Sequence, residues 1–308
     1  ADILRKWQLT GAPSLTSLCI FALENFNVKL PEDMAQAILI SSVLGEVEND
    51  LSYHNNMHYR KVLFNVIRLI NVHNDIYKTT ARAFDAAQIG LLMVAACIHD
   101  LGHDGRGNTI KGVFAQGRLE KMSCAISMQY LQAVGYQDAA ALDNLCVMIL
   151  CTEVTPLDDP GNSMNQMKAA YRYHYLGDDS KTHTLNLDSD IAALQTDPQL
   201  TMMCLILHEA DIASSAGMTY DLTKYETSIY MKEIGTKYAR PQHVIDFLNQ
   251  ILPDQKIKDL TYSSGEKQGR TELDRKAIFD LYCVGNNGEH FIVEMQRRNK
   301  SISKTEVA

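Results

Sequence analysis

An apolar run that ends in a histidine and an aspartate constrains this chain more than any other feature. Residues 91–98 are all apolar, and His99, Asp100, a second histidine, His103, and a glycine-rich turn follow them. The run has the length of a buried helix and is too short to cross a bilayer. Unpaired polar groups at a buried helix end lower the stability of the folded state by several kcal/mol. Coordination of a metal ion removes that cost, because imidazole and carboxylate are both metal ligands.

The spacing within this run leaves two interpretations open. His99 and His103 lie four residues apart, so they share one helical face if the helix continues through Gly102. A single histidine at such a position is more often a hydrogen-bonded core residue than a metal ligand. The metal interpretation therefore depends on the rest of the chain.

Two further stretches supply matching residues. His54 and His58 are also four residues apart and are predicted to project from one helical face. Another apolar run, residues 205–214, contains Asp211. Three apolar helices thus each present a histidine or an acid. Two imidazoles and two carboxylates, with water in the remaining positions, complete the ligand set of one divalent ion. The predicted ligands are His58, His99, Asp100 and Asp211.

Composition narrows the class of protein. The chain has 308 residues, of which 46% are apolar, so it can bury a sizeable core. Its net charge of −8, without a long basic run, argues against binding to nucleic acid. Seven scattered cysteines predict reduced core thiols and a cytoplasmic location, and no signal peptide or membrane span is visible. The first residue is not methionine, which suggests a piece of a longer protein with regulatory domains or a homodimer partner.

Periodicity predicts a compact all-α fold with a short C-terminal β-hairpin. Pro31 and the acids after it predict a helix start, and Asn287-Gly288 between two β-favouring runs predicts the hairpin. We expect one helical domain over residues 1–260, and a linker with the hairpin over residues 261–308. The predicted helices span residues 31–43, 51–72, 81–99, 118–134, 139–151, 166–175 and 187–213, and one or two more are expected over residues 221–251.

The order of the motifs resembles the class I 3′,5′-cyclic-nucleotide phosphodiesterases, which belong to the HD-domain metallophosphohydrolases. The motifs are Tyr-His-Asn-x-x-His from residue 53, His-Asp-x-x-His-x-Gly-x-x-Asn from residue 99, and His-x-Ala-Asp ending at residue 211. The resemblance covers residues 40–250. It implies zinc on the four predicted ligands and a second ion, magnesium or manganese, bridged by Asp100. It further implies His54 as the proton donor, and water-binding roles for His103 and Glu120.

The resemblance implies hydrolysis of a cyclic nucleotide to the 5′-monophosphate by a metal-bridging hydroxide. Cyclic AMP is preferred to cyclic GMP, and the expected partner is a small molecule, with no nucleic acid. Two alternatives stay open: an HD-type hydrolase of another nucleotide or phosphate ester, and a non-catalytic binding module stabilised by its metal.

The substrate end departs from the family pattern. Thr152 matches a threonine near the second metal, but Glu153 replaces the usual aspartate. Gln242 is the best match for the glutamine that holds the base, and Ile245 replaces the phenylalanine that stacks on it. A surface glutamine is an equally good interpretation of Gln242, so the base specificity is open.

The tail has a resemblance of its own. Residues 279–282 and 291–296 resemble the acid-hairpin-acid segment of PD-(D/E)xK transposase-type nucleases, with Asp280 and Glu294 as the metal ligands. Because little of that fold is present, we favour a structural hairpin.

Overall fold

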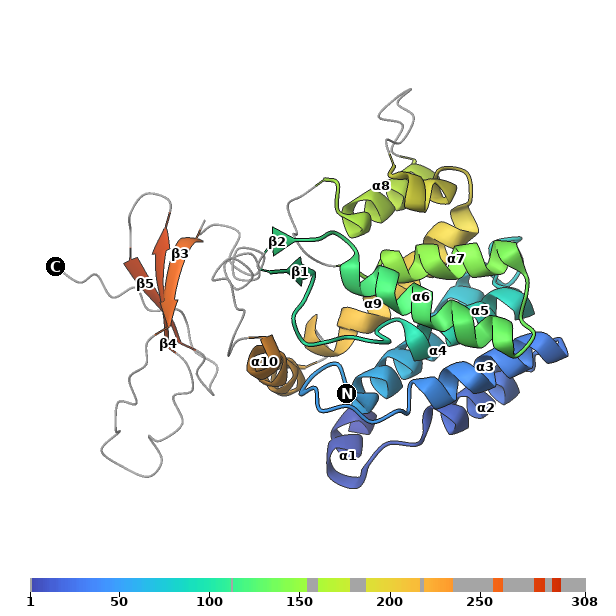
Figure 1. Ribbon diagram of the computed structural model, residues 1–308, viewed down its shortest axis with the longest axis horizontal. Coiled ribbons are helices and arrows are strands. Elements are labelled where there is room, and N and C mark those ends of the chain that lie inside the picture. Colours follow the sequence, from blue (N-terminus) through green and yellow to red (C-terminus); the bar gives the residue numbers. More distant parts are fainter. Residues whose placement is uncertain are drawn as a thin grey trace. The chain divides into compact units, whose positions relative to one another are not determined.

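The computed structural model describes residues 2–111, 113–153, 160–177, 187–216, 219–234, 257–262, 280–285 and 290–294. They form two compact units, residues 1–236 and residues 237–308. The domain boundary at residue 260 stays a prediction. The first unit is helical, which confirms the predicted all-α class (Figure 1).

The helical unit is built from ten α-helices, a 3₁₀ helix and one two-stranded ribbon among the described residues. The α-helices are α1 (Asp2–Thr10), α2 (Leu15–Phe26), α3 (Glu32–Leu44), α4 (Asn56–Tyr77), α5 (Ala86–Ile98), α6 (Arg118–Ala133), α7 (Ala139–Leu150), α8 (Ser163–Tyr175), α9 (Pro198–Ala216) and α10 (Tyr220–Ile234). The 3₁₀ helix η1 spans Ser189–Gln195. Strands β1 (Thr109–Ile110) and β2 (Val113–Phe114) form the ribbon.

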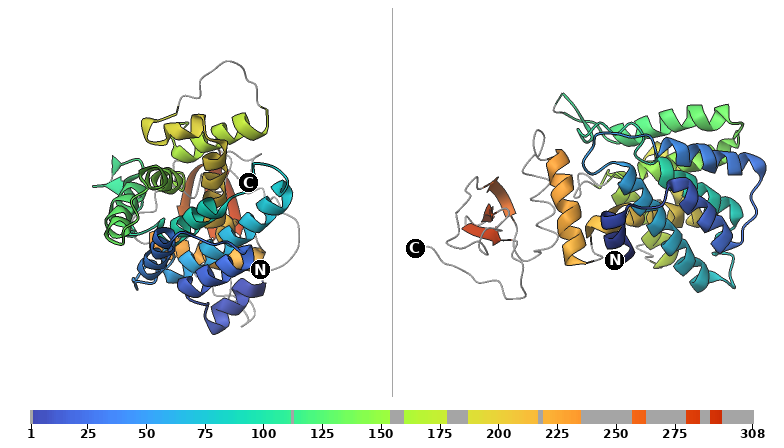
Figure 2. Two further views of the ribbon diagram at one scale, coloured as in Figure 1. Left: turned by 90° about the vertical axis from the view of Figure 1, so that its right-hand side faces the viewer. Right: turned by 90° about the horizontal axis from the view of Figure 1, so that it is seen from below.

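Helix α5 is the centre of this unit. All ten residues from Ile89 to Ile98 are buried, and α5 packs against α3, α4, α7 and α9 (Figures 1 and 2). Its start is fixed by a capping box, in which Asp85 accepts the backbone N–H of Gln88 and Gln88 accepts that of Asp85. The predicted apolar run is therefore the buried core helix, and its polar end lies inside the unit.

Helix α4 packs against α5 and carries an apolar stripe. Val62, Leu63, Val66, Ile67 and Ile70 are all buried at spacings of three and four residues, which places them on one face.

The helices expected over residues 51–72 and 81–99 begin five residues later, at Asn56 and Ala86, and the first of them continues to Tyr77. Two further expected helices also differ from the observed ones. Residues 187–213 were expected to form one helix, but η1 ends at Gln195 and α9 begins at Pro198. Proline lacks a backbone N–H and therefore favours the first position of a helix over its interior. Of the one or two helices expected over residues 221–251, α10 begins one residue earlier, at Tyr220, and extends to Ile234; residues 235–251 lie outside the described residues.

The second unit contains a three-stranded antiparallel sheet in the order β3-β4-β5. Its strands are β3 (Ile257–Tyr262), β4 (Asp280–Gly285) and β5 (His290–Glu294). The pairing of β4 with β5 confirms the predicted hairpin, in which Asp280 and Glu294 are register partners. Strand β3 was not expected from the sequence.

Six cysteines of the helical unit are free thiols, and all but Cys146 are buried, as predicted for reduced core thiols: Cys19, Cys97, Cys124, Cys146, Cys151 and Cys204. Among the described residues, no helix is both long and apolar enough to span a membrane.

Candidate metal centre

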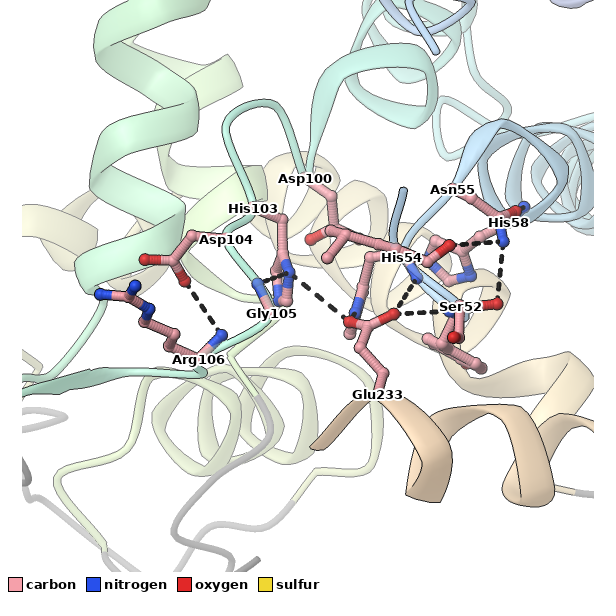
Figure 3. Close-up of polar contacts among 12 residues, drawn as sticks. Ser52, His54, Asn55, His58, Asp100, His103, Asp104, Gly105, Arg106 and Glu233 are labelled. Carbon is pink, nitrogen blue, oxygen red and sulfur yellow. Dashed lines mark hydrogen bonds and ion pairs between the residues drawn. The ribbon is translucent and has the colours of Figure 1, made fainter. Parts of the chain in front are cut away.

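His58 follows the capped start of α4. The side-chain oxygen of Asn55 accepts hydrogen bonds from the backbone N–H groups of Met57 and His58, at 3.0 and 3.4 Å (Figure 3). Because Asn55 has extended backbone angles, φ −115° and ψ 180°, the helix begins only after it. His54 therefore lies in the preceding segment, and the expectation that His54 and His58 share a helical face is wrong. The cap satisfies donors that a helix start leaves free.

His99 and Asp100 lie at the buried end of α5. Nδ1 of His99 is 3.2 Å from the carbonyl oxygen of Ala96. When Nδ1 donates to that oxygen, Nε2 keeps its lone pair, which is the tautomer that a metal ligand needs. The helix stops here, because Gly102 has φ +79°. His103 therefore does not share a helical face with His99, in contrast to the expectation from their spacing.

Helix α9 supplies the fourth side chain. This helix packs against α4, and Oδ1 of Asp211 lies 3.0 Å from Nε2 of His58. The structure thus brings His58, His99, Asp100 and Asp211 together from three helices, with all four potential ligand atoms within 4.8 Å of one another.

The spacing of these four atoms fits a bound metal ion. Nε2 of His58 is 3.3 Å from Nε2 of His99 and 3.3 Å from Oδ2 of Asp100. Nε2 of His99 is 3.2 Å from Asp100 and 3.6 Å from Asp211. Ligands about 2.0–2.1 Å from a tetrahedral centre are separated by about 3.3–3.4 Å. The Nε2 atoms of His58 and His99 also face each other. A proton on one of these nitrogens cannot form hydrogen bonds to the other nitrogen and to both carboxylates at once.

Burial and charge support the same interpretation. The side chains of His58 and His99 are 2% and 0% exposed, whereas those of Asp100 and Asp211 are 16% and 17% exposed. Burial raises the carboxyl pKa values, but the two histidines outweigh it and hold the pKa of Asp100 and of Asp211 well below the usual range. Two carboxylates in a buried site require compensating positive charge. Burial lowers the pKa values of His58 and His99, but the two carboxylates outweigh it and raise them, so protons on these histidines or a bound metal ion can supply that charge. The described residues therefore include a candidate site for a divalent metal.

A second cluster is held by hydrogen bonds. Oε1 of Glu233, on α10, lies 2.5 Å from Nδ1 of His54, and Oε2 accepts the backbone N–H groups of Tyr53 and His54 (Figure 3). The rings of His54 and His103 are stacked with centroids 3.7 Å apart. A contact of 2.5 Å is a short hydrogen bond and is shorter than the separation of two ligands on one metal ion. Glu233 therefore acts as an orienting partner of His54.

His103 stacks on His54 and also lies near Glu233, with Nδ1 3.8 Å from Oε1 of Glu233. The same Nδ1 accepts the backbone N–H of Gly105 at 3.2 Å. Burial, followed by the neighbouring His54, lowers the pKa of His103 to about 4. His103 is therefore neutral at pH 7, and its ring can hold its position beside His54 without adding charge.

A third group surrounds Asn108. Its side-chain amide donates to Glu120 and to Glu153, at 2.9 Å in each case. Burial and the Glu153 carboxylate raise the pKa of Glu120 to about 7, against the opposing hydrogen bond from Asn108. Thr152 donates its hydroxyl to the carbonyl oxygen of Ile149 at 2.8 Å. Substrate contact by Thr152 and Glu153 stays a prediction, and Gln242 and Ile245 lie outside the described residues.

Sequence reasoning missed the role of two residues. Glu233 is 179 residues from His54 and follows no recognisable spacing. Asn108 belongs to the motif that starts at His99, and its position in that motif could have suggested a role.

One comparison with known proteins gives a match. Residues 231–305 match the family model of the PD-(D/E)XK nuclease family transposases. The match includes the acidic hairpin with Asp280 and Glu294, so it does not support our preference for a purely structural hairpin. Curated protein sequences give no match to the chain.

This match overturns the expected function. The assignment to the class I cyclic-nucleotide phosphodiesterases is wrong, because the family that matches is one of nucleases. Hydrolysis of cyclic AMP or cyclic GMP is rejected with it, and neither the HD-type phosphohydrolase nor the binding module is supported. The expected small-molecule partner, with no nucleic acid, is contradicted for the same reason.

The error has two physical causes. Histidine and aspartate ligands specify metal chemistry, which many reactions share, and leave the substrate undefined. The net charge of the whole chain, −8, hides a difference between its segments. Residues 231–305 are slightly basic, with 13 Lys and Arg against 10 Asp and Glu. Over this segment, about a quarter of its length, the chain is similar to the PD-(D/E)XK nuclease family transposases.

Proposed function

We propose that this protein is a divalent-metal-dependent hydrolase of phosphodiester bonds in DNA. The observation that carries the proposal is the buried set of His58, His99, Asp100 and Asp211, whose ligand atoms have the separations of a metal coordination shell. The similarity of residues 231–305 to a nuclease family supports DNA as the substrate class.

The ligand set suggests the metal. Two imidazoles with two carboxylates favour zinc over magnesium, and a carboxylate such as Asp100 could also reach a second ion, magnesium or manganese. When bound, a divalent ion supplies Lewis-acid polarisation and a lowered pKa of coordinated water.

The residues around the metal site would move and hold protons. Hydrolysis of a phosphodiester expels an alkoxide that needs a proton, and we assign its donation to His54. Glu233 binds Nδ1 of His54 at 2.5 Å, which fixes the orientation of the ring. His103 stacks on the same ring. Glu120, with a pKa of about 7, can exchange a proton near neutral pH and is assigned to the ordering of water.

A second candidate centre lies in the other unit. Asp280 and Glu294 are register partners on the adjacent strands β4 and β5, within the matched segment. Two carboxylates on paired strands are suitable ligands for magnesium or manganese. This pair could catalyse the same reaction without the helical centre.

Cleavage of plasmid DNA by the full chain tests the proposal and distinguishes the two centres. The assay uses zinc, magnesium and manganese singly and together, with a chelator as the blank. Asp211→Asn removes a ligand of the helical centre, and Asp280→Asn removes one of the hairpin pair. Asp143→Asn, the same change at an exposed position of α7, is the matched control.

We expect chelator-sensitive cleavage that Asp211→Asn reduces by about 100-fold or more and that Asp143→Asn leaves unchanged. If only Asp280→Asn abolishes cleavage, the hairpin is the active centre and the helical site is not catalytic. No cleavage by metal-loaded wild type, or equal cleavage by all variants, rejects the proposal. If the protein hydrolyses a simple aryl phosphodiester but does not cleave DNA, the metal-dependent hydrolysis is supported and DNA is rejected as the substrate.

A further inference from the structure

A buried ion pair joins the helix of the metal ligand His58 to the helix of Glu233. Nζ of Lys61, on α4, lies 2.5 Å from Oε1 of Glu226, on α10, and the two side chains are only 3% and 1% exposed. Lys61 also lies over the ring of Tyr225, with Nζ 5.9 Å from the ring centroid. Two buried charges tolerate few alternative arrangements, because displacement of either leaves the other unpaired in a low-dielectric interior.

The positions of these two residues connect them to the proton-donating cluster. Lys61 follows His58 by three residues, so both lie on one face of α4. Glu226 precedes Glu233 by seven residues, which is two turns of α10, so these two also share a face. One face of α10 therefore carries two carboxylates: Glu226 binds α4, and Glu233 binds the segment before α4.

Other contacts of α10 do not define its position as sharply. Among its described residues, Leu222 and Glu226 are buried, and the side chain of Glu233 is only 3% exposed. The Tyr230 ring lies against the Tyr53 ring with centroids 5.2 Å apart. An aromatic edge contact and one buried leucine tolerate small sliding movements, whereas an ion pair of 2.5 Å does not.

We propose that Lys61 and Glu226 are positioning residues that fix α10 along its axis, so that Glu233 reaches His54 and the backbone N–H groups of Tyr53 and His54. The inference rests on the proposed function only where His54 is the proton donor. The geometric part, that Lys61 controls the contacts of Glu233, holds for any reaction at this site. A helical residue rises by about 1.5 Å, so a slide of α10 by a fraction of one residue breaks a hydrogen bond of 2.5 Å.

Hydrogen exchange measured by mass spectrometry tests the geometric part without an activity assay. Both backbone N–H groups that Glu233 accepts lie in one short segment, at 2.5 Å for Tyr53 and 3.1 Å for His54. We expect Lys61→Met to accelerate exchange in a peptide that contains these two amides by about tenfold or more. Glu233→Gln, which weakens the acceptor directly, should produce the same local change.

Matched variants separate positioning from general destabilisation. Arg60→Met removes the neighbouring cation, which pairs with Glu46 instead of with α10, and it should leave the exchange of the peptide unchanged. Lys61→Arg keeps the charge and should restore wild-type exchange. The double variant Lys61→Met with Glu226→Met removes both charges and covers the case in which the single variant does not fold. It should fold and still show accelerated exchange.

DNA cleavage by the same variants then tests the connection to activity. We expect Lys61→Met to lower kcat by at least tenfold with little change in KM, and to retain bound metal. Wild-type exchange of the peptide in folded Lys61→Met or in the folded double variant overturns the inference. Accelerated exchange in a protein that cleaves no DNA in any form leaves the positioning role standing and rejects only the proposed function.

Discussion

Removal of one ligand should abolish the metal-dependent stability of the helical unit. The perturbation is Asp211→Asn, which keeps the shape of the side chain but replaces an anionic ligand with a neutral one. Oδ1 of Asp211 lies 3.0 Å from Nε2 of His58 and 3.6 Å from Nε2 of His99, so the change affects its contacts with both histidines. The quantity to compare is the shift in Tm between metal-loaded and chelated protein, measured for each variant separately.

The expected shift follows from the size of the unit. Zinc at 100 times its Kd stabilises the folded state by about 2.7 kcal/mol. A unit of residues 1–236 unfolds with an entropy of about 0.5 kcal/mol/K, at about 2.1 cal/mol/K for each residue. The quotient is a shift of about 5 °C for the wild type. If loss of the ligand weakens binding by about 100-fold, the same zinc concentration gives about 0.4 kcal/mol, which is a shift of less than about 1 °C.

Thermal unfolding followed by circular dichroism, together with the metal content of the dialysed protein, provides the assay. Asp143→Asn should retain the full shift, because the same substitution lies far from the four ligands in the sequence and on an exposed site. A shift of about 5 °C in Asp211→Asn refutes the assignment of this carboxylate as a ligand. A wild type that binds no stoichiometric metal and shows no shift refutes the metal centre itself.

Two further predictions concern the loop and the acids beside the site. Gly102→Ala should cost more than about 1 kcal/mol in urea unfolding, because Gly102 has φ +79° and an added Cβ would lie 2.7 Å from Cδ1 of Ile126. Gly107→Ala, also at positive φ but with open space around it, should cost less. Burial and Glu153 raise the pKa of Glu120 from 4.5 to about 7. The stability that this provides is complete below about pH 4.5 and is lost as the pH rises through about 7. The stability of Glu120→Gln relative to wild type should therefore increase between about pH 5 and about pH 8, and a constant difference would contradict the assignment.

Much of the helical unit could be predicted because its signals are local. The apolar run before His99 is a fully buried helix, and the stripe on α4 follows the helical repeat. The four candidate metal ligands could be named because each lies in or next to an apolar helical run. A polar side chain at a buried helix end is stable only when it binds a metal ion or forms hydrogen bonds within the core.

The rest depends on contacts that no local pattern encodes. His54 was placed on a helix because of its spacing from His58, but Asn55 competes for the free N–H groups and starts the helix after itself. Glu233 reaches His54 only because two distant segments pack together. The break before Pro198 was visible in the sequence as a polar run, Gln195-Thr196-Asp197, ahead of the proline, but the apolar runs on either side favoured a single helix.

The two candidate centres can be distinguished by the metals that they prefer. The helical site offers two imidazole nitrogens and two carboxylates, and nitrogen ligands raise the affinity for zinc relative to magnesium. The register pair Asp280 and Glu294 offers oxygen alone, which suits magnesium or manganese and binds them more weakly. Cleavage at the helical site should therefore survive dialysis and fail only after prolonged chelation. Cleavage at the hairpin should depend on the free magnesium or manganese concentration and stop when either ion is diluted. The metal that restores activity after chelation thus identifies the centre, and it does so without any substitution that could disturb the fold.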